Sequence, residues 1–459
     1  MNFGIDAIDY YLPKLSLSIS ELANKRNIPA DKLQKGLGLK SIALVDSDED
    51  AASMAANALL NLINNNNINP NSIGRIYLGT ESALDAAKPT ATYAVGTVEK
   101  KLGHKHGERC FKNCDVVDLT FACIGAVDAL ENCMDWVRLD TKRKAIVIAS
   151  DIAKYELESS GEYTQGAGAV AFLIKSNPDL ININPTIGVS TNHVGDFFKP
   201  RRILSNIALK ANNGVSIHEI TKSRKEELEL FYEEPIFDGY YSNQCYQERI
   251  NEGLDHFNTQ KKTNFLNDWD HYIFHLPYAF HGRRMMLDIW LKWLKENKLF
   301  GLLEEEIGKG GKVDNKEWKK AAANSSIYKD FINRKIIDGE QASSYIGNMY
   351  TASIFMSLIS LLTISLQENK NITGNKIGFL SYGSGSKSKV FEGTVAEKWK
   401  NKINKINVFK SLNERNTVNF ETYQKLHNSI IKSPILVNDA IVLTGIETIE
   451  NKQGFRYYN

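Results

Sequence analysis

Short apolar runs alternate with segments of helical periodicity along most of the chain. In the first half, apolar runs predict strands at 75–80, 116–121, 145–152 and 169–174. The segments 81–95 and 126–137 have the spacing of helices. Runs this apolar are typical of strands that are covered on both faces, so the pattern favours a mixed α/β fold with largely buried sheets.

The same plan recurs in the second half. It predicts strands at 186–190, 272–277 and 377–383, and helices at 281–294 and 350–366. The recurrence indicates a duplicated core, with one half at 1–176 and the other at 177–459. Residues 350–366 are apolar enough to suggest a membrane span, but they contain several Ser and Thr and fall short of the usual ~20 apolar residues. We interpret them as a buried core helix and expect no membrane partner.

Two polar regions interrupt this pattern, one near 203–233 and the other near 298–340, and we interpret both as surface insertions. The segment SRKEELELFYEE (223–234) predicts a short solvated helix. In the second region, WKKAAA (318–323) and FINRKI (331–336) predict helical pieces.

Composition is that of a globular protein. The chain has 459 residues, of which 42% are apolar and 24% charged, so its length favours two domains or two fused halves. A net charge of +2 gives no reason to expect a nucleic-acid partner. Five cysteines without zinc-ligand spacing and an N-terminus without a signal peptide predict a reduced, cytoplasmic protein with no metal site.

Cys123 is the strongest candidate nucleophile. It lies in DLTFACIGAVDAL, where a predicted strand gives way to small residues and then to a helical pattern. This arrangement places the thiol at a helix N-terminus, where the macrodipole and free N–H groups would favour the thiolate and could receive an oxyanion. The alternative is a small buried residue that packs under the helix, as we expect for the other four cysteines.

Glu81 and His275 are the other candidates. Glu81 follows the strand 75–80, and burial would raise its pKa towards that of a general base; it could equally be an exposed residue in the first turn of a helix capped by Thr80. His275 ends an apolar strand and could be a structural residue, as we expect for His281. The Gly-rich turns at 161–172 and 381–388 match no phosphate or dinucleotide fingerprint, so no cofactor is expected.

Eight segments, in chain order, resemble hydroxymethylglutaryl-CoA synthase. They cover most of the chain apart from the two insertions and the C-terminal tail, which starts at Phe409. The segments are GIDAIDYYLPK, KGLGLKSIA, GTESALDAAK, ASDIAKYELESSGEYTQGAGAVA, FDGYYSNQCY, FHLPYAF, GNMYTASIFMSLISLL and FLSYGSGS.

The resemblance implies a thiolase fold with two similar halves, each built on a mixed sheet between helices. It also implies condensation of acetyl-CoA with acetoacetyl-CoA to give 3-hydroxy-3-methylglutaryl-CoA, as in the mevalonate pathway of isoprenoid biosynthesis, by a homodimer. By position, Cys123 resembles the acylated nucleophile, Glu81 the general acid/base, and His275 the residue that polarises the second substrate. The resemblance implies that seven further residues bind substrate: Tyr155, Thr164, Pro235, Arg284, Asn348, Tyr382 and Ser384.

The sequence departs from the family at Ile124, where a Tyr usually follows the nucleophile, and at Arg284, which replaces a Lys. These departures leave open a β-branching synthase of polyketide assembly, whose acyl chain is held on an acyl carrier protein. A non-catalytic scaffold would be expected to lack Cys123, Glu81 or His275, and all three are present. A fatty-acid β-ketoacyl synthase has no Glu at the position of Glu81.

Overall fold

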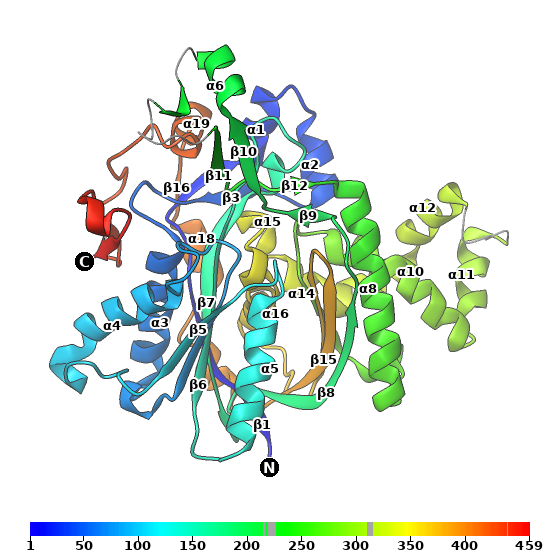
Figure 1. The fold of residues 1–459 in the computed structure, drawn as a ribbon. Coiled ribbons are helices and arrows are strands. Elements are labelled where there is room, and N and C mark those ends of the chain that lie inside the picture. The colour runs from blue at the N-terminus through cyan, green and yellow to red at the C-terminus, as the bar shows by residue number, and fades with distance from the viewer. Residues whose placement is uncertain (214–215, 219–225, 310–314, 438) are drawn as a thin grey trace.

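The computed structural model describes residues 1–213, 216–218, 226–309, 315–437 and 439–459. A nine-stranded sheet runs through it in the order β13-β14-β15-β8-β1-β7-β6-β4-β5 (Figure 1). Its strands are β1 (Phe3–Tyr11), β4 (Arg75–Gly79), β5 (Asp115–Leu119), β6 (Ala145–Ala153), β7 (Gly166–Ser176), β8 (Ile181–Thr191), β13 (His271–Phe274), β14 (Lys376–Gly383) and β15 (Lys387–Val395).

The two halves of the chain build their parts of this sheet in the same way. In the first half, β7 is antiparallel to both β1 and β6, and β6 is parallel to β4. In the second, β15 is antiparallel to both β8 and β14, and β14 is parallel to β13. The parts join where β1 pairs with β8 through Gly4–Asn182 and Ile5–Ile181, so the expected two sheets form one.

Helices cover the sheet in layers. Two central helices share a hydrophobic core with strands of both halves, whereas the other long helices pack on the outer faces (Figure 1). The central helices are α5 (Gly125–Arg138) and α16 (Ser353–Gln367). The outer ones are α3 (Ala51–Asn66), α4 (Thr90–His106), α8 (Gly239–Gln260) and α10 (His281–Glu296).

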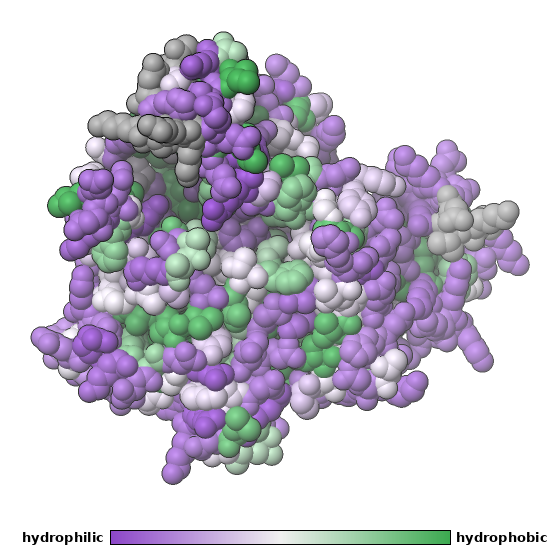
Figure 2. Space-filling view, in the orientation of Figure 1, coloured by the Kyte–Doolittle hydropathy of each residue, from purple (hydrophilic) through white to green (hydrophobic). Residues whose placement is uncertain are grey.

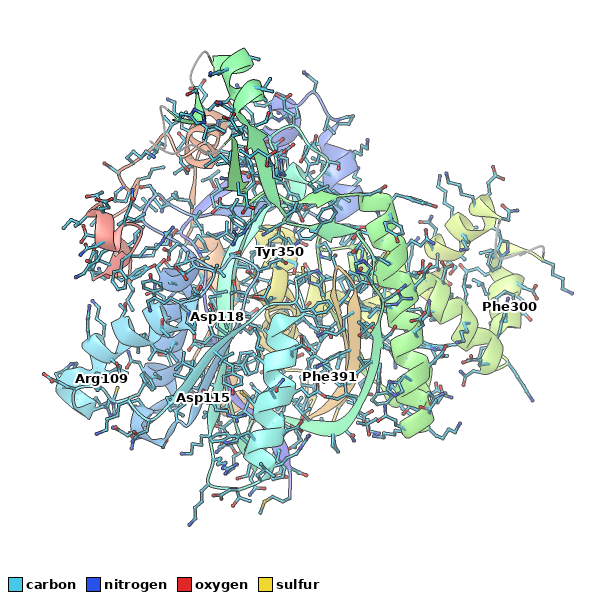
Figure 3. All side chains as sticks on the ribbon, in the orientation of Figure 1. Arg109, Asp115, Asp118, Phe300, Tyr350 and Phe391 are labelled. Atoms are coloured by element: carbon cyan, nitrogen blue, oxygen red, sulfur yellow. The ribbon has the colours of Figure 1, made fainter. Side chains whose placement is uncertain are left out.

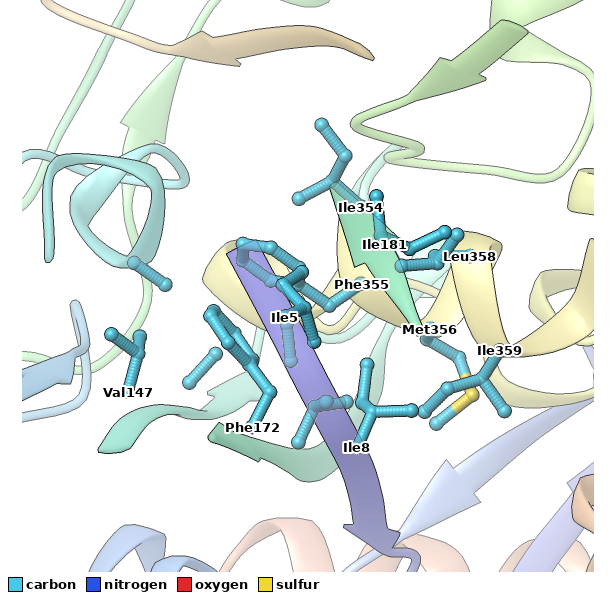
Figure 4. Close-up of a cluster of buried hydrophobic side chains, with 14 of the residues drawn as sticks. Ile5, Ile8, Val147, Phe172, Ile181, Ile354, Phe355, Met356, Leu358 and Ile359 are labelled. Carbon is cyan, nitrogen blue, oxygen red and sulfur yellow. The ribbon is translucent and has the colours of Figure 1, made fainter. Parts of the chain in front are cut away.

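The core between the two halves is tightly packed. Ile5 and Ile8 of β1 lie among side chains of β7 and α16, and the rings of Phe172 and Phe355 are 4.4 Å apart (Figure 4). In the described parts of the chain, Tyr350–Gln367 is the one stretch long and apolar enough to cross a membrane, and 83% of it is buried. The prediction of an interior helix is therefore confirmed.

The segment 81–95 departs from its predicted helix. Residues 81–89 form a loop, and α4 begins only at Thr90. Pro89 stands immediately before the helix, and the Asp118 carboxylate accepts hydrogen bonds from the N–H groups of Thr90 and Ala91. The first N–H groups of any helix have no partner within the helix. Asp118 on β5 accepts from two of them in α4, so a residue distant in sequence fixes where α4 starts.

The secondary structure predicted for the first insertion is wrong. Residues 214–215 and 219–225 lie outside the described chain, but the part of SRKEELELFYEE that is described forms a strand, β11 (Glu227–Phe231), antiparallel to β10 (Arg201–Ser205). The sequence ELELF alternates polar and apolar residues, and the structure exposes Glu227 and Glu229 while half-burying Leu228 and Leu230. This period of two favours a strand.

The second insertion is helical, as predicted for its two helical pieces. It forms α11 (Phe300–Ile307), α12 (Lys316–Asn324) and α13 (Ser326–Lys335), with residues 310–314 outside the described chain. Leu303, Trp318 and Phe331 are buried in one cluster with Trp290 of α10. The insertion therefore extends the core of the second half.

On the face shown in Figure 2, polar side chains predominate and hydrophobic groups form small separate patches.

The C-terminal tail returns to the first half of the molecule. It contains β16 (Asn416–Thr417), α19 (Phe420–His427), β17 (Leu443–Ile446) and β18 (Arg456–Tyr458), and β16 pairs with β2 (Leu15–Ser18). The Asp50 carboxylate accepts hydrogen bonds from Arg456 at 2.8 Å and from the Tyr458 hydroxyl at 2.7 Å. Asn57 exchanges two hydrogen bonds with the backbone of Ile441.

Candidate active site

Cys123 lies in a tight turn between β5 and α5. The preceding Ala122 has a φ of 38°, a left-handed conformation that is costly for a residue with a Cβ and that persists mainly at functional sites. Gly383 of β14 approaches so closely that a Cβ there would lie 2.7 Å from the Phe121 carbonyl oxygen. The second half of the molecule thus presses against the nucleophile turn, and Cys123 is only 8% exposed.

Glu81 faces Cys123. The Cys123 thiol donates a hydrogen bond to Glu81 Oε1 at 3.1 Å. The loop that carries Glu81 is held by the buried Asp151, whose Oδ1 accepts from the Glu81 N–H at 2.8 Å and from Thr80 Oγ1 at 2.9 Å. Asp151 and Glu81 meet because β6 and β4 are parallel neighbours that end at the same edge of the sheet.

The electrostatics correct one expectation. Burial raises the pKa of the Cys123 thiol well above its usual value, and the Glu81 charge raises it further. The expected helix-terminus thiolate is therefore not the resting state, because burial and a carboxylate outweigh the macrodipole. Burial likewise raises the pKa of Glu81 to about 7. The resting pair is a thiol that donates to a carboxylate able to accept its proton near neutral pH.

His275 stands just beyond β13 and is almost fully buried. Its Nδ1 lies 2.6 Å from Ser353 Oγ, and this oxygen already accepts a hydrogen bond from the Leu276 N–H. The Ser353 hydroxyl can donate its hydrogen to Nδ1, and in that tautomer the imidazole proton lies on Nε2. Burial lowers the pKa of His275 to about 3, so the ring is neutral. A neutral ring with its proton on Nε2 is a hydrogen-bond donor.

Tyr350 connects His275 to the nucleophile. The imidazole hydrogen-bonds to the backbone of Tyr350, whose ring packs in one cluster with Cys123 and Tyr155. Tyr350 begins the short 3-10 turn η3 (Tyr350–Ala352) that leads into α16, between the two halves (Figure 3). Its φ of 41° is the second strained non-glycine conformation at this site.

The other predicted binding residues lie at different distances from this centre. Tyr155 packs in one cluster with Cys123, and Asn348 hydrogen-bonds to Tyr155. Tyr382 stacks on Tyr246 with ring centroids 4.4 Å apart, and Ser384 hydrogen-bonds to Tyr382.

Three predicted residues stand apart from these contacts. The Thr164 carbonyl accepts from the Asn348 N–H at 2.9 Å, behind the wall of the site. Pro235 precedes β12 (Ile236–Phe237), whose Phe237 ring packs on Tyr155. Arg284 is exposed on α10, with its guanidinium 3.7 Å from the position that a Cβ on Gly36 would take. The structure does not bring Arg284 into contact with the catalytic group.

Sequence reasoning missed three residues of the centre, namely Asp151, Lys199 and Tyr350. Asp151 had a detectable signal, since it is a charged residue at the end of a strongly apolar strand. Lys199 gave no such signal, although its Nζ lies 3.8 Å from Glu81 Oε2. Within the described ranges, no group of three or more His, Cys, Asp or Glu side chains is placed to hold a metal ion.

Comparison with known proteins agrees with this geometry. The family model for the N-terminal part of hydroxymethylglutaryl-coenzyme A synthase matches residues 1–179, and the model for the C-terminal part matches residues 226–433. Hydroxymethylglutaryl-CoA synthase of Haloferax volcanii is 29% identical over 93% of this chain and 91% of its own length. The hydroxymethylglutaryl coenzyme A synthase of a Fusarium species is 31% identical over 92% of this chain and 89% of its own length.

Solved structures share the fold over the whole chain. MvaS in complex with 3-hydroxy-3-methylglutaryl coenzyme A superposes with a TM-score of 0.78 at 26% identity, covering 100% of this chain and 99% of that one. The HMG synthase of the curacin biosynthetic pathway, solved with an acetyl donor-ACP, has a TM-score of 0.76 at 19% identity and covers 100% of both chains, which shows the fold alone. This chain belongs to the hydroxymethylglutaryl-CoA synthase family and is a condensing acyltransferase with a thiolase-like fold.

Proposed function

We propose that this protein condenses acetyl-CoA with acetoacetyl-CoA and water to give 3-hydroxy-3-methylglutaryl-CoA and free CoA. The observation that carries the proposal is the buried pair of Cys123 and Glu81, with their side chains 3.1 Å apart. A thiol next to a base with a pKa of about 7 suits both transfer of an acyl group and removal of a proton from carbon.

The first step is transfer of the acetyl group to Cys123. Glu81 takes the thiol proton as sulfur attacks the thioester carbon, and the C–S bond to CoA breaks. The proton then passes to the departing CoA sulfur, so Glu81 is again a carboxylate. Because the thiol is held in its protonated form, this step depends on an acceptor in hydrogen-bond contact.

The second step forms the carbon–carbon bond. Glu81 removes a proton from the acetyl methyl, and the resulting enolate carbon attacks the C3 ketone of acetoacetyl-CoA. His275 donates a hydrogen bond from Nε2 to the ketone oxygen as negative charge develops there. The proton held by Glu81 then passes to the alkoxide, and water cleaves the thioester between Cys123 and the product, which leaves a carboxylic acid on the product and a thiol on Cys123.

The direct test incubates the purified protein with acetyl-CoA and acetoacetyl-CoA and follows 3-hydroxy-3-methylglutaryl-CoA by mass spectrometry. We expect a product with one CoA and release of the other CoA. A parallel reaction offers the acetyl group on an acyl carrier protein. We expect CoA to be the better carrier, because among the described residues beside the first insertion Arg201 pairs with Glu229 and Arg202 with Glu156, which reduces the positive charge that they offer to an acidic carrier. Faster acetylation by the carrier protein would instead favour the β-branching reaction.

The same proposal includes the compartment, the pathway and the oligomeric state of the enzyme. We place it in the cytoplasm, in the mevalonate pathway, where its five free thiols suit a reducing compartment. A homodimer is supported by β5, which ends the nine-stranded sheet and pairs with β4 on one side. An open strand edge is a ready site for pairing with a second copy. Native mass spectrometry will show whether the protein has twice the mass of the chain.

His275→Ala should impair the second step far more than the first. Its proposed partner is the acetoacetyl ketone, which is absent while the acetyl-enzyme forms. We expect near-normal acetylation of Cys123, measured by intact mass, and a fall in product formation of about 10²- to 10³-fold. His104→Ala on the exposed part of α4 is the control. Equal losses in acetylation and in turnover would assign His275 to the first step instead.

A further inference from the structure

Lys199 contacts Glu81 at both its carboxylate and its backbone. It follows the short strand β9 (Phe197–Phe198), which pairs with β12 beside the site. Its Nζ lies 3.8 Å from Glu81 Oε2 and donates to the Glu81 carbonyl oxygen at 3.3 Å. The side chains of Lys199 and Glu81 are 11% and 5% exposed. The ammonium therefore touches both the carboxylate and the backbone of the general base.

A second contact fixes the lysine itself. Its Nζ lies 4.8 Å from the centroid of the Tyr350 ring, in the range of a cation–π interaction. Tyr350 belongs to the second half of the molecule and contacts Cys123 in the same cluster. Lys199 is thus held between the base on one side and an aromatic wall of the site on the other.

Apart from Lys199, the surroundings of Glu81 disfavour a negative charge on its carboxylate. The titratable groups that face it are the Cys123 thiol from the nucleophile turn, Asp151 from β6, the phenols of Tyr155 and Tyr350, and Lys199. Asp151 and burial both raise the pKa of Glu81, and Lys199 lowers it. Of the five facing groups, Lys199 is the one that supplies positive charge, and so it offsets the cost of an ionised carboxylate in a buried site.

We propose that Lys199 is a positioning residue that keeps the Glu81 carboxylate ionised and turned towards Cys123. This role of Lys199 rests on the proposed function in one respect, namely that Glu81 is the base of the proposed reaction. The cation acts through Glu81 and needs no contact with substrate. Its salt bridge uses Oε2, and this leaves Oε1 for the thiol.

The test measures how the alkylation of Cys123 by iodoacetamide depends on pH, by peptide mapping, in variants that separate charge from hydrogen bonding. Lys199→Met removes both, Lys199→Gln keeps a donor for the Glu81 carbonyl, and Lys199→Arg keeps the charge. Removing the cation should raise the pKa of Glu81 and of the Cys123 thiol. We expect Met and Gln to shift the profile upwards by about one pH unit, a roughly tenfold slower reaction below the midpoint.

Lys199→Arg should stay close to the wild-type profile. Arg201→Met is the matched control, because it removes a positive charge two residues away that pairs with the exposed Glu229. An unshifted profile in both Met and Gln variants, or an equal shift in the Arg variant, would overturn the proposal. Alkylation requires no acyl substrate, so this result stands whether or not the protein makes 3-hydroxy-3-methylglutaryl-CoA. The acid limb of turnover should then shift in the same direction.

Discussion

Cys123→Ser should take up no acetyl group from acetyl-CoA, whereas the wild-type protein should gain the mass of one acetyl group. Serine retains a buried donor for Glu81 and occupies less space, so the fold should persist. A hydroxyl is, however, a far weaker acid than a thiol and a poor nucleophile towards a thioester. Intact mass spectrometry after rapid quenching measures the acetyl-enzyme, and thermal unfolding reports the fold.

The matched control is Cys114→Ser, which changes a half-exposed thiol outside the catalytic centre. This variant should be acetylated at the wild-type rate. Peptide mapping of the acetylated wild-type protein should place the group on Cys123. An acetyl group found on Cys110 or Cys133 would show that the nucleophile has been wrongly assigned.

Glu81→Gln should separate the two half-reactions. The amide keeps the size of the side chain but cannot take a proton from the acetyl methyl, so product formation should fall by at least ~10²-fold. Acetylation should fall too, because Glu81 accepts the thiol proton in that step, but by less, because loss of the Glu81 charge removes one cause of the raised pKa of Cys123. Measuring acetyl-enzyme and 3-hydroxy-3-methylglutaryl-CoA in the same samples gives both rates. Condensation above about a tenth of the wild-type rate would rule out Glu81 as the base.

The same carboxylate fixes the pH dependence of the wild-type enzyme. Glu81 acts only when ionised, so turnover should increase with pH through its pKa of about 7 and fall on acidification. His275 has a pKa of about 3 and stays neutral over this range. A pH profile of kcat therefore tests the base, and its acid limb should be lost in Glu81→Gln.

Much of this architecture can be predicted from the sequence, because its signals are local. The runs at 75–80 and 145–152 are apolar throughout and form buried strands, and 350–366 forms an interior helix. The helix predicted at 223–234 is wrong. The charged residues of this segment suggested a solvated surface helix, whereas the alternation in ELELF favours a strand. A short segment fits both patterns, and pairing with β10 decides between them.

The centre of the site is harder to predict, since it is built by contacts between distant segments. Cys123, Glu81 and His275 are found from motifs, but the state of the thiol depends on how deeply it is buried. Lys199 carries no local signal, because a lysine in a polar turn is normally solvated. Only the pairing of β9 with β12 directs it to Glu81, which lies 118 positions earlier in the chain.

The return of the tail to the first half sets an order for folding during synthesis. Asp50 and Asn57 leave the ribosome long before their partners, because Tyr458 and Ile441 lie 408 and 384 positions later in the chain. Until then the side chains of Asp50 and Asn57 lack these native partners and are hydrated instead. A nascent chain stalled before residue 441 should therefore be more sensitive to protease around α3 than the released protein. The first half of this enzyme is therefore completed only after most of the second half has been made.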